Sequence, residues 1–92
     1  MIEYKDALDI AKKHLSINET SKNVILEENT IEKEFGWVFF YQSRKFLETG
    51  DYRFYLLGNS PLIINRNNGE VHVTGTARSA EYYINEYENT HS

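Results

Sequence analysis

Five large apolar or aromatic residues follow one another in the middle of the chain: Trp37, Val38, Phe39, Phe40 and Tyr41. Successive side chains of a β-strand point to opposite faces, so the first, third and fifth of these share one face and the other two share the second. A strand that is apolar on both faces is typical of the middle of a sheet, where a helix or another chain segment covers each side. We therefore predict that the fold is arranged around this strand.

Gly36 directly precedes the tryptophan. A glycine within a strand indicates a β-bulge or the close approach of another backbone, and we expect it to bend the strand so that Trp37 turns inward. The clustered rings could instead form a platform for an aromatic ligand, or leave a pocket for a small ligand beside Trp37. We favour a core position, because a helix over that face would fill such a pocket.

Both ends of the chain carry apolar residues at helical spacing. Between Ile2 and about Leu15 the apolar stripe consists of Tyr4, Ala7, Leu8, Ala11 and Leu15. Near the other end, Ser79 is the expected N-cap of a helix that runs to about Glu88. The buried stripe of this second helix consists of Ala80, Tyr83, Ile84 and Tyr87. Residues 89–92 are expected to fray.

Two apolar segments flank an Asn-Gly dipeptide, which is the strongest short signal for a β-hairpin. A type I′ turn at Asn68-Gly69 would pair Ile64 with Val73 and Arg66 with Val71. This register gathers the apolar side chains on one face, as the core requires. They are Leu62, Ile64, Val71 and Val73.

The remaining segments are shorter and less distinct. Residues 23–28 predict a strand, followed by a turn or bulge at Asn29-Thr30, and the pattern leaves open whether residues 31–34 pair with the aromatic strand. Residues 42–50 end that strand in polar side chains. Residues 51–57 suit irregular structure, one helical turn capped by Asp51 or an edge strand, so residues 44–57 stay undetermined. Gly58 to Pro61 predicts a turn.

The order is therefore helix, strands, helix. It predicts an α+β fold in which an antiparallel three- to four-stranded sheet is covered by an N-terminal and a C-terminal helix. We expect residues 1–92 to form a single domain, because there is no repeat, low-complexity tract or linker and the length suits one core.

Composition narrows the classes of function. With 14 acidic and 10 basic residues the net charge is −4, which argues against nucleic-acid binding, since that needs a basic face. We find no signal peptide and no run approaching the roughly 20 apolar residues that span a bilayer, so we expect a cytoplasmic protein without a membrane partner. The absence of cysteine excludes disulfides, thiolate metal sites and a cysteine nucleophile.

Candidate catalytic and metal-binding residues are few. The histidines are scattered: His14 ends a helix, His72 lies on a strand and His91 lies in the tail. In the predicted hairpin His72 points away from the apolar face, opposite Asn65, and should be solvated. No nucleophile elbow, zinc-protease helix, P-loop or dinucleotide-binding fingerprint is present. We expect no enzymatic activity, no metal and no cofactor.

Four short motifs occur in a fixed order along almost the whole chain, from about Ala7 to Tyr87. They are Gly36-Trp37-Val38-Phe39-Phe40-Tyr41, Gly58-Asn59-Ser60-Pro61, the hairpin with Asn68-Gly69-Glu70-Val71, and Gly75-Thr76-Ala77 ahead of the last helix. In this order and spacing the motifs resemble the immunity protein 35 family, the YrhB-like small bacterial proteins.

The resemblance implies an immunity protein of a polymorphic toxin system: a toxin inhibitor without enzymatic activity that binds a cognate toxin and holds it inactive. The positions that carry over define the fold; they are Gly36, Trp37, Gly58, Asn59, Pro61 and Gly69. No toxin-contact residue carries over, because contact surfaces change with the toxin. Ser60 and Asn65 depart from the family pattern, in which a small residue and often an aspartate are expected.

Two surfaces are candidates for binding the partner. The first is acidic and comprises Glu32 and Glu34, in a cluster with Glu27 and Glu28, together with Glu86 and Glu88. The last two lie at the helix end where the dipole disfavours negative charge, so they could serve to meet a basic toxin cleft. Solvated charges on a fraying helix end are the simpler interpretation.

The second candidate surface is the loop from Arg44 to Tyr55, with Tyr52, Arg53 and Tyr55, since tyrosine and arginine are the side chains that interfaces favour as anchors. The same segment could instead cover the Trp37 face of the sheet, which we expect of Phe54 and Leu56. The alternative function is a small holdase-like chaperone, although its usual methionine-rich groove is absent: Met1 is the single methionine. The sequence leaves open whether the protein is a monomer or a homodimer.

Overall fold

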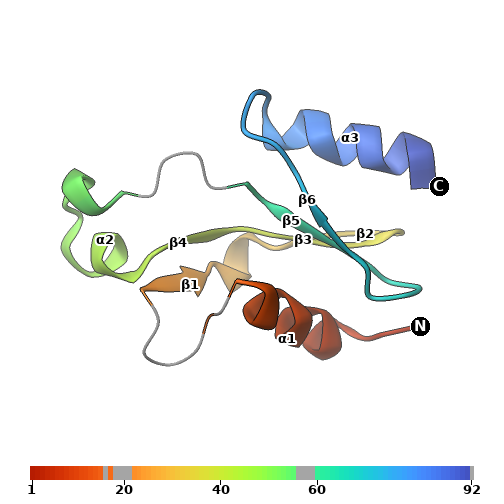
Figure 1. The fold of residues 1–92 in the computed structure, drawn as a ribbon, viewed down its shortest axis with the longest axis horizontal. Coiled ribbons are helices and arrows are strands. Elements are labelled where there is room, and N and C mark those ends of the chain that lie inside the picture. The colour runs from red at the N-terminus through yellow and green to blue at the C-terminus, as the bar shows by residue number, and fades with distance from the viewer. Residues whose placement is uncertain (16, 18–21, 56–59, 92) are drawn as a thin grey trace.

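The structure is a computed structural model that describes residues 1–15, 17, 22–55 and 60–91 (Figure 1). The helices are α1 (Tyr4–His14), α2 (Arg44–Thr49) and α3 (Ala80–His91), with short 3₁₀ helices η1 (Glu27–Asn29) and η2 (Tyr52–Phe54). The strands are β1 (Asn23–Ile25), β2 (Ile31–Lys33), β3 (Gly36–Phe39), β4 (Tyr41–Ser43), β5 (Leu62–Asn65) and β6 (Val71–Val73).

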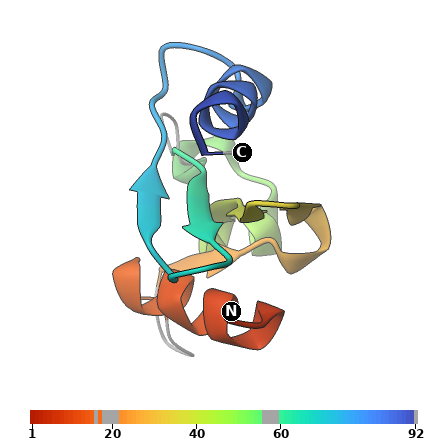
Figure 2. The same ribbon diagram turned by 90° about the vertical axis from the view of Figure 1, so that its right-hand side faces the viewer.

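Four strands form an antiparallel sheet in the order β2-β3-β5-β6, and β1 and β4 form a second, two-stranded antiparallel sheet. Helix α1 lies on one side of the larger sheet and α3 on the other, as the two views show (Figures 1 and 2). The predicted α+β fold with an antiparallel sheet covered by an N-terminal and a C-terminal helix is confirmed. The additional small sheet was not predicted.

Strand β3 lies inside the larger sheet, between β2 and β5, and its alternating side chains supply both halves of the core. On the α1 side, the buried cluster consists of Trp37, Phe39, Ala7, Ala11, Leu62 and Ile64. On the α3 side it consists of Val38, Phe35, Ile63, Ile84 and Tyr87. Trp37 is only 3% exposed. The prediction of an interior strand with cover on both faces is confirmed for Trp37 to Phe39, and the tryptophan is a core residue rather than an open ligand platform. The predicted continuation to Tyr41 is wrong: β3 ends at Phe39, and Tyr41 belongs to β4, which pairs with β1 in the smaller sheet.

Gly36 is where another strand comes closest to β3. Its φ of 146° is one that residues with a side chain rarely adopt, and a Cβ atom there would collide with the carbonyl oxygen of Ile64 on β5. Next to it, the N–H of Arg66 donates to the carbonyl oxygen of Phe35 at 2.7 Å. The predicted close approach of a second backbone is therefore present.

The β5–β6 hairpin exists, but its predicted register is wrong by two residues. Leu62 lies opposite Val73, and Ile64 lies opposite Val71. A shift of two residues keeps each side chain on its predicted face, so the pattern of apolar side chains could not distinguish the two registers. His72 consequently lies opposite Ile63 rather than Asn65, and it is exposed as predicted.

The longer hairpin loop results from two asparagine side chains. The N–H of Asn65 donates to the carbonyl oxygen of Glu70 at 2.9 Å, which closes a loop of residues 66–69. Within it, Oδ1 of Asn65 accepts from the N–H of Asn67, and Oδ1 of Asn68 accepts from the N–H of Glu70, both at 2.9 Å. Gly69 takes the left-handed conformation with φ 72°. These side-chain bonds stabilise a four-residue loop in place of the type I′ turn.

Asn65 also joins the sheet to α3. It is 8% exposed, and its Nδ2 donates to the hydroxyl of Tyr87 at 3.0 Å. A buried amide needs such partners, because an unsatisfied one costs about 1–3 kcal/mol. The one asparagine thus sets the hairpin loop and docks the C-terminal helix.

The other elements differ from prediction mainly at their ends. Ser79 caps α3, since its Oγ accepts from the N–H of Tyr82 at 3.3 Å, but the helix continues to His91 instead of fraying at residue 89. Residues 27–29 form a 3₁₀ helix, not the end of a strand, and residues 31–33 pair with β3. Pro61 directly precedes β5, where its carbonyl oxygen accepts from the N–H of Thr74. The predicted turn residues Gly58 and Asn59 lie outside the described residues.

We predict that Gly36→Ala lowers the free energy of unfolding by about 3 kcal/mol or more, since the new methyl group meets backbone that cannot move aside. Gly50→Ala is the matched control, because Gly50 also has positive φ (70°) but nothing lies within 4 Å of the added Cβ; it should cost only about 1–2 kcal/mol. Urea denaturation of both variants measures the difference. Equal losses would show that the approach of Ile64 is not what requires the glycine.

Candidate functional site

Residues 43–55 form a compact unit of α2 and η2 at one end of the elongated molecule (Figure 1). Oγ of Ser43 accepts from the N–H of Phe46 at 3.3 Å and starts α2. Gly50, in the left-handed conformation, ends it and donates its N–H to the carbonyl oxygen of Phe46 at 2.7 Å. Residues 42–50 were predicted to end the aromatic strand in polar side chains. In the structure only residues 42 and 43 belong to a strand, β4, and the helix α2 follows. Of the alternatives left open for residues 51–57, the structure has the helical turn capped by Asp51, as η2 (Tyr52–Phe54); residues 56 and 57 lie outside the described residues.

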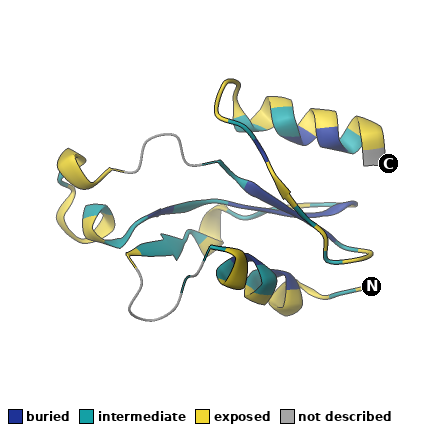
Figure 3. Cartoon of the chain, in the orientation of Figure 1, coloured by how far each residue is buried: buried dark blue, intermediate teal, exposed yellow. Residues whose placement is uncertain are grey.

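The rings of this unit pack on one another rather than into the core. The ring centroids of Phe46 and Tyr55 are 4.9 Å apart, those of Phe46 and Tyr52 5.4 Å, and those of Tyr52 and Tyr55 5.9 Å. Four side chains here are well exposed: Tyr52 78%, Leu47 48%, Tyr55 40% and Phe54 37%. Figure 3 shows that η2 is largely exposed and α2 partly so, whereas β3 and β5 in the middle of the molecule are buried.

We call this surface the aromatic end; it consists of Phe46, Leu47, Tyr52, Phe54 and Tyr55. Four of the five side chains are exposed, and Phe46 is half-buried beneath the two tyrosine rings. Exposed apolar side chains gathered in one segment are characteristic of an interaction surface. Tyr52 and Tyr55 were named as candidates for such a surface, whereas Phe46 and Leu47, in the same candidate loop, were not singled out. Their signal was the spacing of Ser43 and Gly50, a helix N-cap and C-cap residue on either side of a short helical stretch.

Arg53, the third predicted contact residue of this segment, is held within it. Its Nη2 lies 2.6 Å from Oδ2 of Asp51, and its Nε donates to the same carboxylate. The side-chain hydrogen bonds of Arg53, followed by its backbone N–H, lower the pKa of Asp51 below the ordinary value of 3.8. The guanidinium also lies 5.7 Å from the ring of Phe54, and Nζ of Lys45 lies 5.0 Å from it.

The expectation that this segment covers the Trp37 face is wrong for Phe54, which is 37% exposed. Helix α1 covers that face instead, through Ala7 and Ala11. Leu56, the other residue expected to cover it, lies outside the described residues. The aromatic end is therefore not needed to close the main core.

The predicted acidic contact residues lie elsewhere. Glu32 is on β2 and Glu34 in the turn before β3, while Glu86 and Glu88 are in the second half of α3. Both groups lie toward the end of the molecule opposite α2 (Figure 1), so the structure does not join them to the aromatic end. Glu34 and Glu86 are exposed, and Glu88 is half-buried. A hydrogen bond to Glu86 raises the pKa of Tyr82.

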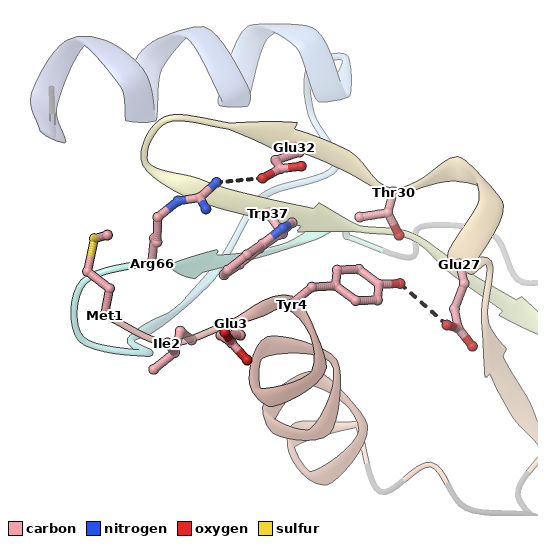
Figure 4. Close-up of a pocket in the computed structure, with 9 residues that line it drawn as sticks. All are labelled: Met1, Ile2, Glu3, Tyr4, Glu27, Thr30, Glu32, Trp37 and Arg66. Carbon is pink, nitrogen blue, oxygen red and sulfur yellow. Dashed lines mark hydrogen bonds and ion pairs between the residues drawn. The ribbon is translucent and has the colours of Figure 1, made fainter.

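Glu32 lines an open groove of about 670 Å³ between the start of α1, β2 and the hairpin loop (Figure 4). Nη2 of Arg66 lies 2.9 Å from Oε2 of Glu32, and its guanidinium lies 4.5 Å from the ring of Trp37. Tyr4 donates to Oε1 of Glu27 at 3.4 Å, and the pKa of Tyr4 is raised, chiefly by burial. Arg66 therefore already provides the positive charge that Glu32 and the ring of Trp37 would attract from a ligand.

Among the described residues we find no arrangement of side chains that supports metal binding or catalysis by a histidine. Among those residues no group of three or more histidine, cysteine, aspartate or glutamate side chains could hold a metal ion. His14 ends α1 and His72 lies on β6, where its ring centroid is 5.2 Å from that of Tyr87. None of the described helices has the length and apolar character to span a bilayer.

Comparison with known proteins gives two matches. A family model described as Immunity protein 35 matches residues 5–89. The chain is also 40% identical over 90 residues to the protein of Escherichia coli (strain K12) named "Uncharacterized protein YrhB", a match that covers 96% of this chain and 90% of that protein. No solved structure matches the chain.

The Asp51–Arg53 pair makes a prediction about pH. Because the pKa of Asp51 is lowered in the folded protein, the pair should remain fully formed above the ordinary pKa of about 4 and be lost as pH falls through the lowered value. In the Arg53→Met variant the pKa of Asp51 should rise, remaining somewhat low because the backbone N–H of residue 53 still donates. A carboxyl-detected NMR titration measures it. Lys45→Met is the control and should leave that pKa unchanged; identical shifts in both variants would exclude the pair as the cause.

Proposed function

The chain belongs to the immunity protein 35 family, and from that premise we propose that it binds a cognate bacterial toxin and holds the toxin inactive through a protein–protein interface. In this proposal the immunity protein acts in the cytoplasm and inactivates the toxin by binding alone, with no chemical step.

The observation that carries the proposal is the aromatic end. Tyr52 is 78% exposed although the chain has an apolar core in which to bury rings. Exposing a large apolar surface is unfavourable in a free protein and is typical of a surface that a partner covers. Interface hot spots are enriched in tyrosine, which combines a large apolar ring with a hydrogen-bonding hydroxyl.

The geometry also suits rigid docking. Phe46 holds the rings of Tyr52 and Tyr55 by edge-to-face and tilted contacts, and Asp51 fixes Arg53 beside them. Side chains that are already ordered lose less conformational entropy when a partner binds. We propose that Tyr52 and Tyr55 are the anchors of an interface of roughly 800 Å² per partner, with Arg53 at its rim.

The acidic residues have a different part in this proposal. Glu32, Glu34, Glu86 and Glu88 lie away from the aromatic end, and the chain has a net charge of −4. A negative field accelerates the approach of a basic toxin without requiring direct contact. Charge reversal of Glu34 and Glu86 would then slow association and weaken its dependence on salt, while leaving the dissociation rate nearly unchanged.

The test is the substitution Tyr52→Ala, measured by calorimetric titration with the cognate toxin once a pull-down with this chain has identified it. Loss of an anchor should weaken binding by about 2 kcal/mol, roughly 30-fold. The side chain is largely exposed, but its ring contacts those of Phe46 and Tyr55, so the free energy of unfolding should fall by about 1–2 kcal/mol. A thermal melt of the variant confirms that it is folded at the temperature of the titration. Tyr82→Ala is the matched control, an exposed tyrosine on α3 (45%), and should bind like the wild type.

An equal loss of binding in both variants, or none in either, would contradict the proposed surface. The holdase-like alternative makes a different prediction: the protein would then suppress aggregation of several unrelated unfolded proteins, and the Tyr52→Ala variant would lose that activity for all of them. Tight binding to one toxin, without effect on such proteins, supports the immunity function.

A further inference from the structure

Strand β6 is one edge of the four-stranded sheet, and β2 is the other. Sheet edges carry outward-facing backbone groups that can pair with another chain, and proteins usually protect them with charged side chains. Strand β2 has Glu32 and Lys33. Strand β6 consists of Val71, His72 and Val73, with no acidic side chain, lysine or arginine.

The hydrogen bonds that flank β6 show which of its backbone groups face outward. Glu70 accepts from the N–H of Asn65, and Thr74 donates its N–H to Pro61. Because backbone groups alternate in direction along an antiparallel strand, the positions that face β5 are 70, 72 and 74. The N–H and C=O groups of Val71 and Val73 therefore point away from the sheet.

Nothing in the described fold lies along this edge. Figure 2 shows α3 above the sheet and α1 below it, with β6 along its outer side. The side chain of Val73 is 53% exposed and that of Val71 is half-buried. An uncharged edge with an exposed valine is a favourable template for strand addition.

We propose that β6 pairs with β6 of a second copy of this chain, antiparallel about a two-fold axis at His72, so that two four-stranded sheets become one continuous sheet. In this register Val71 lies opposite Val73 of the partner subunit, and Val73 lies opposite Val71 of the partner subunit. Each of these pairs exchanges two N–H···O bonds. The proposal is independent of what the aromatic end binds.

We identify the partner strand as a second β6 because β6 is complementary to itself. Registers that centre on Val71 or Val73 form a single such pair, whereas the register that centres on His72 satisfies the outward groups of both valines. It also places an exposed valine beside a valine twice, an arrangement that β-branched side chains favour across strands. Glu70 would lie opposite Thr74 of the partner subunit, so no like charges meet. A two-fold axis gives exactly this isologous contact.

Cysteine cross-linking tests the register, because the chain has no cysteine of its own. In the proposed dimer, residue 72 faces its own copy at a position without hydrogen bonds, where Cα atoms are about 4.5 Å apart, within disulfide range. His72→Cys should therefore form a covalent dimer rapidly under mild oxidation. In the Val73→Cys variant, each cysteine lies opposite residue 71 of the partner subunit, so the two cysteines are offset from each other by two positions along the strands. Their Cα atoms are then more than about 7 Å apart, which is too far for a disulfide. This variant should cross-link no faster than Leu47→Cys at the aromatic end.

Sedimentation velocity over a concentration series tests the association itself. The wild type should form dimers, and Val73→Lys should raise the dissociation constant at least about tenfold, because it brings a charge into the centre of the pairing. Leu47→Lys adds the same charge at a similarly exposed side chain (48% against 53%) and should dimerise like the wild type.

A wild-type chain that stays monomeric throughout the series, or His72→Cys that cross-links no faster than Leu47→Cys, would overturn the proposal. A monomeric free chain whose toxin binding is weakened by Val73→Lys would show instead that the edge receives a strand of the toxin.

Discussion

Burial of both faces of β3 is the constraint on which the remaining structure depends. Each large apolar side chain taken out of water contributes about 1.5–3 kcal/mol, and Trp37, Val38 and Phe39 are all buried. Such a strand needs a neighbour on each side and a helix over each face, which here are β2, β5, α1 and α3. Gly36 makes this possible, since a side chain at that position would push β5 away.

The sequence predicts those parts of the fold that depend on the periodicity of apolar side chains. The interior strand, both covering helices and the faces of the hairpin strands follow from it. The hairpin register does not, since a two-residue shift leaves every face unchanged and the outcome depends on hydrogen bonds of the Asn65 and Asn68 side chains. Asn65 was noted only as a departure from the family pattern, yet it is bonded to Tyr87 and connects the hairpin to α3.

The candidate site was harder to predict because its side chains do not serve the main core. Residues 44–55 show neither helical nor strand periodicity clearly, since their rings pack on one another. Tyrosine and arginine content pointed to Tyr52, Arg53 and Tyr55 as contact residues, and the structure brings them together. Ring contacts of this kind contribute about 0.5–1.5 kcal/mol each, less than burial in the core, so side chains at this end can be exchanged without unfolding the main core.

Because the core is solid, binding is left to the surface, and we propose the aromatic end as the contact. Hydrogen–deuterium exchange of the chain, free and saturated with its toxin, tests this most directly. We expect new protection of the backbone amides of residues 44–55 and no change within β3, whose amides are already protected. Protection confined to the β2–β3 turn and the C-terminal half of α3, with residues 44–55 unchanged, would contradict it.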